Sequence, residues 1–269
     1  MNQAPYHIIK LAKKYLHYYL TAANGKGHGI HSPFVYDFVT KVLDDRRHYY
    51  AYDKVEALRD RLMNDKRIIP VEDLGAGSGR DSAAERSIAS IARNAAKPKK
   101  LGQLLFRIVD HYQPGVCIEL GTSLGLTSAY LALGNPKGKL FTLEGSAAIA
   151  GVAKENLLAL GIDNVELLKG NFDDTLLPLL HGLQSIDLAF IDGNHRYEPT
   201  MRYFGQLMEK IHNQTMLVFD DIHWSEGMEK AWEEIKADPR VTLSIDLFFL
   251  GIVIFSPDIK VKQHFTVRF

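Results

Sequence analysis

Apolar residues in the second half of the chain alternate between short continuous runs and longer stretches with helical spacing. Short apolar runs bounded by turn residues are typical of buried strands, and apolar positions three or four residues apart are typical of helices. From residue 101 onward the two kinds of segment follow one another regularly. The predicted strands span 116–120, 139–144, 165–170, 186–192, 216–221, 241–246 and 248–255, and the predicted helices span 101–112, 126–133, 147–160, 176–180, 199–211 and 224–237.

This alternation predicts an α/β fold with an open, doubly wound sheet that is mostly parallel. The connection between the last two predicted strands is too short for a crossover, so these strands can pair only as an antiparallel hairpin. The N-terminal third differs, because its periodic segments, 6–20, 33–43, 52–64 and 80–94, all read as helices. We therefore predict a helical N-terminal extension or lid over residues 1–97 and a sheet domain over residues 98–269.

Composition narrows the class of protein further. The 269 residues include 32 Lys and Arg and 32 Asp and Glu, so no net charge attracts nucleic acid or an anionic membrane. The single cysteine, Cys117, excludes an internal disulfide framework and fits the reducing cytoplasm. No signal peptide and no membrane-spanning run is expected. Helix 6–20 is expected to pack on the protein, with a membrane-surface helix as the alternative because three lysines cluster in it.

The stretch Glu119-Leu120-Gly121-Thr122-Ser123-Leu124-Gly125 joins a predicted strand to a predicted helix through a glycine turn. Such a turn presents free backbone N–H groups and can hold a nucleotide. The phosphate-binding pattern G-x-G-x-x-G is absent, and an acid ends the strand instead. An acid suits a cationic or hydroxyl-rich ligand, which favours S-adenosylmethionine over a dinucleotide. The contacts predicted here are Glu119, Gly121, Thr122, Ser123 and Gly125.

A second acid, Glu144, ends the next strand 25 residues after Glu119. This spacing is near the offset of about 20 residues at which an acid meets ribose hydroxyls in nucleotide folds. Capping of the following helix is the alternative role for Glu144. After the third strand, Asn171 and Phe172 supply a polar and an aromatic side chain that could hold adenine. Gly145, Ser146 and Asp192 complete the predicted cofactor contacts.

Two other glycine-rich stretches are weaker candidates. Residues 75–79 resemble a cofactor loop, but no apolar strand follows at the distance that such a loop requires. We therefore expect a loop before a helix there. His28 and His31 lie in a glycine-rich turn, which is either structural or a lid that brings a histidine to the substrate.

Acidic residues follow two neighbouring strands of the predicted sheet. Asp192 ends the fourth strand, with His195 three residues later, and Asp220 and Asp221 end the fifth. Because parallel strands lie about 4.8 Å apart, the three carboxylates should converge at one edge and repel one another. A divalent cation would relieve this repulsion, and all-oxygen ligands favour magnesium, manganese or calcium. Helix capping by the acids, or His195 acting as a base without metal, are the alternatives.

From about Leu101 to Phe255 the chain resembles class I S-adenosylmethionine-dependent methyltransferases. The motifs that carry the resemblance are residues 119–125, Glu144 with Gly145, and Asp192. The site is most similar to metal-dependent sugar O-methyltransferases that act on macrolides, in which an Asp-x-x-His loop and an Asp-Asp pair follow successive strands. The resemblance implies Asp192, Asp220 and Asp221 as ligands of Mg²⁺ or Mn²⁺, and His195 as the base.

The expected activity is methyl transfer from S-adenosylmethionine to a hydroxyl group of a small molecule, with a homodimer left open. The cation would lower the pKa of the hydroxyl, and His195 would take its proton. The alternatives are an N-methyltransferase without metal and a non-catalytic S-adenosylmethionine-binding protein. A nucleotide-sugar dehydrogenase is opposed by the missing phosphate fingerprint.

Overall fold

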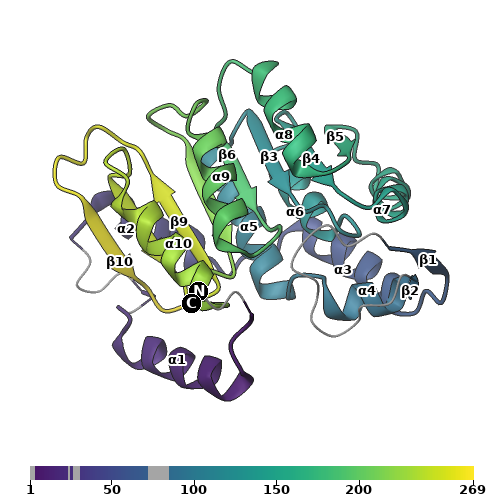
Figure 1. Ribbon diagram of the computed structural model, residues 1–269, viewed down its shortest axis with the longest axis horizontal. Helices are drawn as coiled ribbons and strands as arrows, with labels where there is room; N and C mark the ends of the chain where they lie inside the picture. Colours follow the sequence, from purple (N-terminus) through teal and green to yellow (C-terminus); the bar gives the residue numbers. More distant parts are fainter. Residues whose placement is uncertain (1–3, 24, 27–30, 72–84) are drawn as a thin grey trace. The chain divides into compact units, whose positions relative to one another are not determined.

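The chain folds into two compact units, one built from Met1–Asp45 with Leu183–Phe269 and the other from Arg46–Gly182 (Figure 1). The structure is a computed structural model that describes residues 4–23, 25–26, 31–71 and 85–269. Both units contain predicted sheet strands, so this division differs from the predicted boundary after residue 97.

Among its described residues, the first unit contains five strands in the order β10-β8-β9-β7-β6. β6 and β7 pair in parallel, with Ile191 opposite Phe219, so both strands end at the same edge. β9 runs antiparallel to β7 and to β8, which confirms the predicted C-terminal hairpin. The elements are α1 (Ile8–Thr21), α2 (Pro33–Phe38), the π-helical turn η1 (Val39–Leu43), β6 (Leu188–Ile191), α9 (Tyr197–Leu207), β7 (Met216–Asp220), α10 (Glu226–Ala237), β8 (Leu243–Asp246), β9 (Leu250–Ile254) and β10 (Gln263–Thr266).

The second unit contains the three parallel strands β3, β4 and β5 and a small antiparallel pair, β1 with β2. α5, α6 and α7 are rich in buried apolar residues, and α5 contacts α6 along its length. The elements are α3 (Tyr50–Met63), β1 (Ile68–Pro70), β2 (Glu85–Ser87), α4 (Ile88–Asn94), α5 (Lys99–Tyr112), β3 (Val116–Leu120), α6 (Leu126–Gly134), β4 (Lys139–Glu144), α7 (Ala147–Ala159), β5 (Val165–Lys169) and α8 (Phe172–His181).

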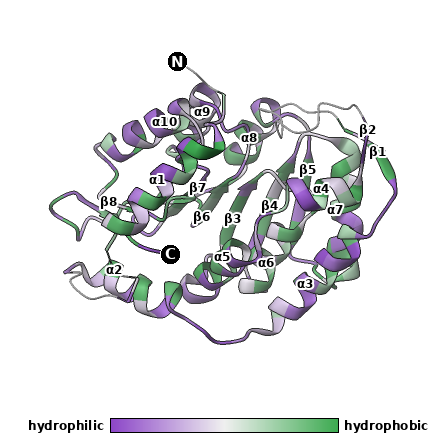
Figure 2. Cartoon of the chain, turned by 90° about the horizontal axis from the view of Figure 1, so that it is seen from below, coloured by the Kyte–Doolittle hydropathy of each residue, from purple (hydrophilic) through white to green (hydrophobic). Residues whose placement is uncertain are grey.

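The core of the first unit contains strands that are buried along their whole length. Every residue of β6, β7 and β9 is buried, and β6 and β7 are coloured mostly as hydrophobic in Figure 2. Trp232 and Ile235 of α10 are each 1% exposed, so this face of the helix points into the core. A Cβ on Gly251 would come within 2.8 Å of the Trp232 ring, so β9 and α10 pack too closely there for any larger residue.

The structure corrects two predicted segments and adds one strand that was not predicted. Glu85–Ser87 is strand β2 rather than helix, because it pairs with Ile68–Pro70, and Ser87 then caps α4 by accepting a hydrogen bond from Ser90 N. The helix predicted over 176–180 begins at Phe172. A further strand, β10, follows the predicted hairpin and pairs in parallel with β8. Its polar composition, typical of an edge strand, concealed it in the sequence.

α1 is held against the C-terminal strands of the same unit. The Tyr18 hydroxyl donates to Val267 O at 2.6 Å and accepts from Phe269 N at 3.0 Å. Ala23 and Val267 form a parallel bridge, which joins the end of α1 to the C-terminal segment. The first helix of the chain is therefore part of the same unit as its last strand.

Candidate active site

The β3–α6 turn of the second unit has the backbone conformation that the glycine pattern predicted. Gly121 and Gly125 have φ values of 104° and 82°, in the left-handed region where a side chain is disfavoured. Ser123 shares this region with a φ of 48°. Gly125 occupies the N-cap position of α6, and the N–H groups of Gly121 and Thr122 donate to Leu143 O. The turn is thereby fixed to the end of β4.

The Glu144 carboxylate joins this turn to the start of α7. Its Oε2 accepts from Ser123 N at 2.8 Å, and its Oε1 accepts from Ser146 N at 3.0 Å. Two backbone donors hold the carboxylate in a single orientation beside the glycine turn. A carboxylate offers about four acceptor positions, so this arrangement is compatible with further bonds to ribose hydroxyls. Glu144 thus combines the capping role and the position expected of a nucleoside ligand.

Glu119 lies deeper than the sequence suggested. Its side chain is fully buried, and its Oε2 accepts from the hydroxyls of Ser128 and Thr142, the latter at 2.6 Å. These bonds connect β3 to α6 and β4. In the structure Glu119 therefore organises the strand ends that carry the turn, and its contact with a cofactor stays a prediction.

Asn171 is the N-cap of α8, where its side chain accepts from Asp173 N at 3.1 Å. Phe172 is the first residue of the helix and is half-buried. The sequence predicted a helix only from residue 176, so both residues were expected to precede it. The acidic Asp173 and Asp174 interrupt the apolar pattern in the first turn of the observed helix. Acids are favourable in that turn, since they face the positive end of the helix dipole.

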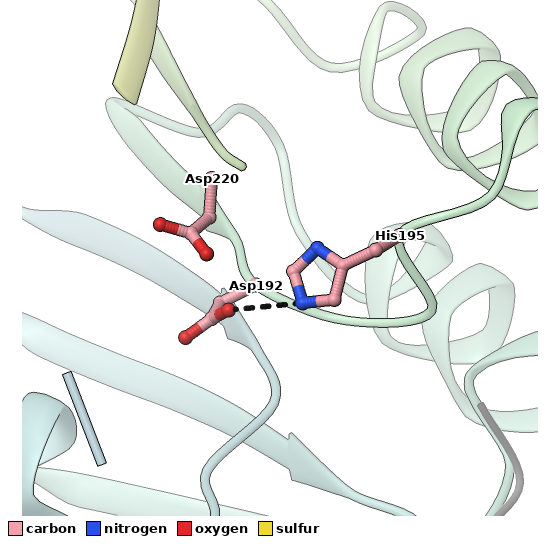
Figure 3. A group of neighbouring side chains, drawn as sticks. All are labelled: Asp192, His195 and Asp220. Atoms are coloured by element: carbon pink, nitrogen blue, oxygen red, sulfur yellow. Dashed lines mark ion pairs between the residues drawn. The ribbon is translucent and has the colours of Figure 1, made fainter. Parts of the chain in front are cut away.

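In the first unit, Asp192, His195 and Asp220 come together at the adjacent ends of β6 and β7 (Figure 3). One ligand atom from each residue lies within 4.8 Å of the other two. His195 Nε2 is 3.4 Å from Asp192 Oδ1, and Asp220 is only 1% exposed. The predicted convergence of Asp192 and Asp220 at one sheet edge is therefore observed.

The loop after β6 that carries His195 is strained. Asn194 and His195 have φ values of 68° and 27°, so two consecutive residues other than glycine adopt the left-handed region. This conformation costs about 1–3 kcal/mol per residue and is concentrated at functional sites. It turns the imidazole back toward Asp192.

Asp221 does not belong to this group. Its φ is 54°, its N–H donates to Phe249 O at 2.7 Å, and its carbonyl accepts from Trp224 N at 2.9 Å. The group of close ligand atoms contains two carboxylates and an imidazole, and a role for Asp221 as the third carboxylate ligand stays a prediction. The two carboxylates fit a divalent cation such as Mg²⁺ or Mn²⁺, which prefers oxygen ligands, whereas an imidazole is a more usual ligand of Zn²⁺, Cu²⁺ or Fe²⁺.

His223 is a half-buried residue on the turn after β7, to which the sequence assigned no role. Its ring donates through Nε2 to Asp246 Oδ2 at 2.8 Å and through Nδ1 to Glu229 Oε1 at 3.0 Å. Burial lowers the pKa of His223, but the hydrogen bonds to the two carboxylates raise it more, to about 9. Burial raises the pKa of Glu229, but the bonds from His223, Lys14 and Tyr6 outweigh it and lower this pKa to about 2.

The charge on His223 should make folding stability depend on pH. Because the folded pKa of about 9 exceeds the ordinary value of 6.5, its stabilisation is complete below about pH 6.5 and lost as the pH rises through 9. We expect His223→Gln to lower the free energy of unfolding by on the order of 2–3 kcal/mol at pH 6, and far less at pH 10.

Urea titrations at both pH values measure this difference, with the exposed His181→Gln as the matched control. A deficit of the same size at both pH values would contradict the assigned charge.

His28 and residues 75–79 lie outside the described residues, and His31 is exposed. The lid prediction for His28 and His31 therefore stays a prediction, as does the loop expected at 75–79. Among the helices of the described part of the chain, none is both long and apolar enough to cross a membrane.

Comparison with known proteins shows which sequences and folds this chain resembles. Residues 118–222 match the family model described as "Methyltransferase domain". Two solved structures share the fold. The O-methyltransferase TomG from Streptomyces achromogenes in complex with SAM is 20% identical, with a TM-score of 0.55 over 82% of this chain and 95% of that chain. The SAH-bound Podospora anserina methyltransferase PaMTH1 is 13% identical, with a TM-score of 0.57 over 94% of this chain and 97% of that chain. The chain therefore has the class I methyltransferase fold, as the glycine and acid motifs predicted.

Among curated proteins, the rat "Transmembrane O-methyltransferase homolog" from Rattus norvegicus is 33% identical over 101 residues. The alignment covers 36% of this chain and 39% of the rat protein. The chain thus spans about two fifths of the length of that relative.

Proposed function

We propose that this protein transfers a methyl group from S-adenosylmethionine to a hydroxyl group of a small molecule, with a divalent cation at Asp192 and Asp220. The observation that carries this proposal is the grouping of Asp192, His195 and Asp220 within 4.8 Å at the ends of β6 and β7. The matched methyltransferase model, and the names of the proteins that the chain is similar to, support the same reaction class. A cytoplasmic location is also proposed, supported by the single buried cysteine.

In this proposal the second unit holds the cofactor. The glycine turn at 121–125 provides the cradle, Glu144 accepts the ribose hydroxyls, and Phe172 lies against the adenine. The remaining proposed contacts are Glu119, Thr122, Ser123, Gly145, Ser146, Asn171 and Asp192. The residues present suit this nucleoside because the cradle combines left-handed glycines with a carboxylate already oriented by Ser123 and Ser146.

Asp192 and Asp220 would hold Mg²⁺ or Mn²⁺, which supplies Lewis-acid lowering of the hydroxyl pKa when bound. His195 would accept the hydroxyl proton on its imidazole, and Asp192 would orient the ring and balance the charge that it gains. An alternative within this proposal is that His195 is the third ligand of the cation, beside Asp192 and Asp220. Asp221 would then not be needed to bind the metal. The Asp192–His195 ion pair also supports a second candidate function, base catalysis on the same fold without metal.

We expect His195→Ala to reduce methyl transfer by about 10²–10⁴-fold, because general-base catalysis contributes that much. Transfer of a radiolabelled methyl group from S-adenosylmethionine to a panel of hydroxyl compounds measures the loss. S-adenosylhomocysteine affinity, measured by calorimetry, should stay near that of the native protein. The matched control is His212→Ala, which removes a histidine paired with Asp187 in the same unit. Turnover that survives in His195→Ala would remove the assignment of this residue as the base.

Dependence on the cation separates the two candidate functions. Metal-assisted transfer should require added Mg²⁺ or Mn²⁺ and stop when a chelator is added, whereas transfer by His195 alone should continue. Binding of S-adenosylhomocysteine with no transfer to any hydroxyl compound would favour the non-catalytic alternative.

A further inference from the structure

The first helix, α1, directs its polar contacts toward the protein and much of its apolar surface away from it. A helix of a globular protein usually buries its apolar stripe against the core and exposes its charged face. In α1, Lys14 instead pairs inward with Glu229 at 2.9 Å, and Lys10 pairs with Glu226 at 3.5 Å. Tyr15 and Tyr18 complete the inward face by packing against Phe248.

The opposite side is what we call the outer face of α1. Its centre is a ridge at i, i+7 and i+11, formed by Ile9, Leu16 and Leu20, which are 60%, 58% and 70% exposed. Ile8 and Tyr19 extend this ridge. Isolated exposed apolar residues need no explanation, but five of them on a single helix form a contiguous patch.

Positive charge accompanies this patch. The exposed Lys13 lies within the outer face, and the Arg268 guanidinium lies 4.4 Å from the centre of the Tyr19 ring at its edge. The first acidic residue of the chain is Asp37, so no carboxylate belongs to α1 or to its flanking residues in sequence. Two acids of α10 that contact α1, Glu226 and Glu229, are paired with Lys10 and Lys14.

We propose that the outer face of α1 binds the surface of an anionic lipid bilayer, with the helix lying in the plane of the interface. Interfacial helices combine an apolar face with lysine or arginine, and their binding depends on both. With 14 residues α1 is too short to span a bilayer, which takes about 20. The neutral net charge predicts no membrane partner. A net charge, however, does not show how the charges are distributed over the surface.

A second copy of the chain fits this face less well. In a two-fold dimer each outer face would meet its own copy, which would bring the two Lys13 ammonium groups toward each other. A stable interface also needs about 800 Å² from each partner, more than one ridge of a four-turn helix provides. A lipid surface requires no such complementarity and attracts Lys13 and Arg268 instead.

The test is co-sedimentation of the full-length protein with vesicles of phosphatidylglycerol and phosphatidylcholine. We expect binding to these vesicles, weaker binding to phosphatidylcholine alone, and a decrease as salt is raised. The triple variant Ile9→Gln, Leu16→Gln, Leu20→Gln should lower the partition coefficient at least about tenfold, since three half-exposed apolar side chains lose their burial in lipid. Glutamine keeps the helix propensity high.

The matched control replaces three equally exposed apolar residues outside α1, in Ile68→Gln, Leu158→Gln, Val261→Gln. This variant should bind vesicles like the native protein. A second readout uses Leu16→Cys carrying an environment-sensitive dye, whose emission should shift to the blue on anionic vesicles, while the native Cys117 is only 4% exposed and escapes labelling.

Three results would overturn the proposal: no binding of the native protein to anionic vesicles, equal binding of the two triple variants, or a dimer in sedimentation velocity that the α1 variant alone abolishes. None of these measurements uses methyl transfer, so the outcome is independent of the proposed activity.

Discussion

Asp220→Asn is expected to weaken Mn²⁺ binding at least about a hundredfold, since loss of a direct ligand should cost no less than the 10–100-fold that loss of an outer-shell partner costs. Asp220 is 1% exposed at the end of β7, and asparagine keeps its shape while removing the charge. Electron paramagnetic resonance of free Mn²⁺, titrated against the protein, measures the affinity without any substrate.

The neighbouring Asp221→Asn provides a matched control for this measurement. Asparagine tolerates the φ of 54° at this position, so the turn should persist. If the ligand set is the group seen in the structure, Asp221→Asn retains Mn²⁺ affinity. His195→Gln then lowers this affinity if His195 is a ligand, and leaves it unchanged if His195 is only the base. If the set is the one expected from the sequence, Asp221→Asn should be as damaging as Asp220→Asn. Unchanged affinity in Asp220→Asn would exclude a cation site at this edge.

Glu144→Gln is expected to weaken S-adenosylhomocysteine binding by about ten- to a hundredfold. The carboxylate accepts from Ser123 N and Ser146 N, and hydrogen bonds to a charged group contribute about 1.5–3 kcal/mol each. A glutamine amide has only one acceptor oxygen, and its NH₂ group would face a backbone donor. The substitution therefore removes the proposed ribose ligand and loosens the glycine turn together.

Calorimetry with S-adenosylhomocysteine measures the affinity, and the exposed Glu166→Gln on β5 is the control that removes the same charge from the same unit. Equal affinities in the two variants would place the nucleoside elsewhere. A thermal shift of Glu144→Gln in the absence of ligand separates the loss of the turn from the loss of the contact.

Most of the sheet could be predicted from the sequence because most of its strands are short, mainly apolar runs bounded by turn residues. Strands β3, β4, β6, β7 and β9 were predicted within a few residues, and the antiparallel hairpin followed from the length of one connection. β10 and β2 were missed because short edge strands contain few apolar residues and depend on partners distant in sequence.

The candidate site was predictable to the level of which strand ends carry its acids. Asp192 and Asp220 end adjacent parallel strands, so their proximity follows from sheet geometry. That His195 rather than Asp221 lies in this group could not be predicted from sheet geometry, because it depends on left-handed φ values at both residues. Glu229 and Asp246, which surround His223, come from α10 and β8 and have no motif that connects them.

The sequence by itself determined the α/β class, the glycine turn and the chemistry available at each strand end, because these depend on residues close together along the chain. Only the tertiary structure decided that Glu119 is internal, that His195 groups with Asp192 and Asp220, and that α1 presents Ile9, Leu16 and Leu20 outward. Each of these outcomes depends on which distant groups surround a side chain, and contacts between distant segments leave no local pattern in the amino-acid order.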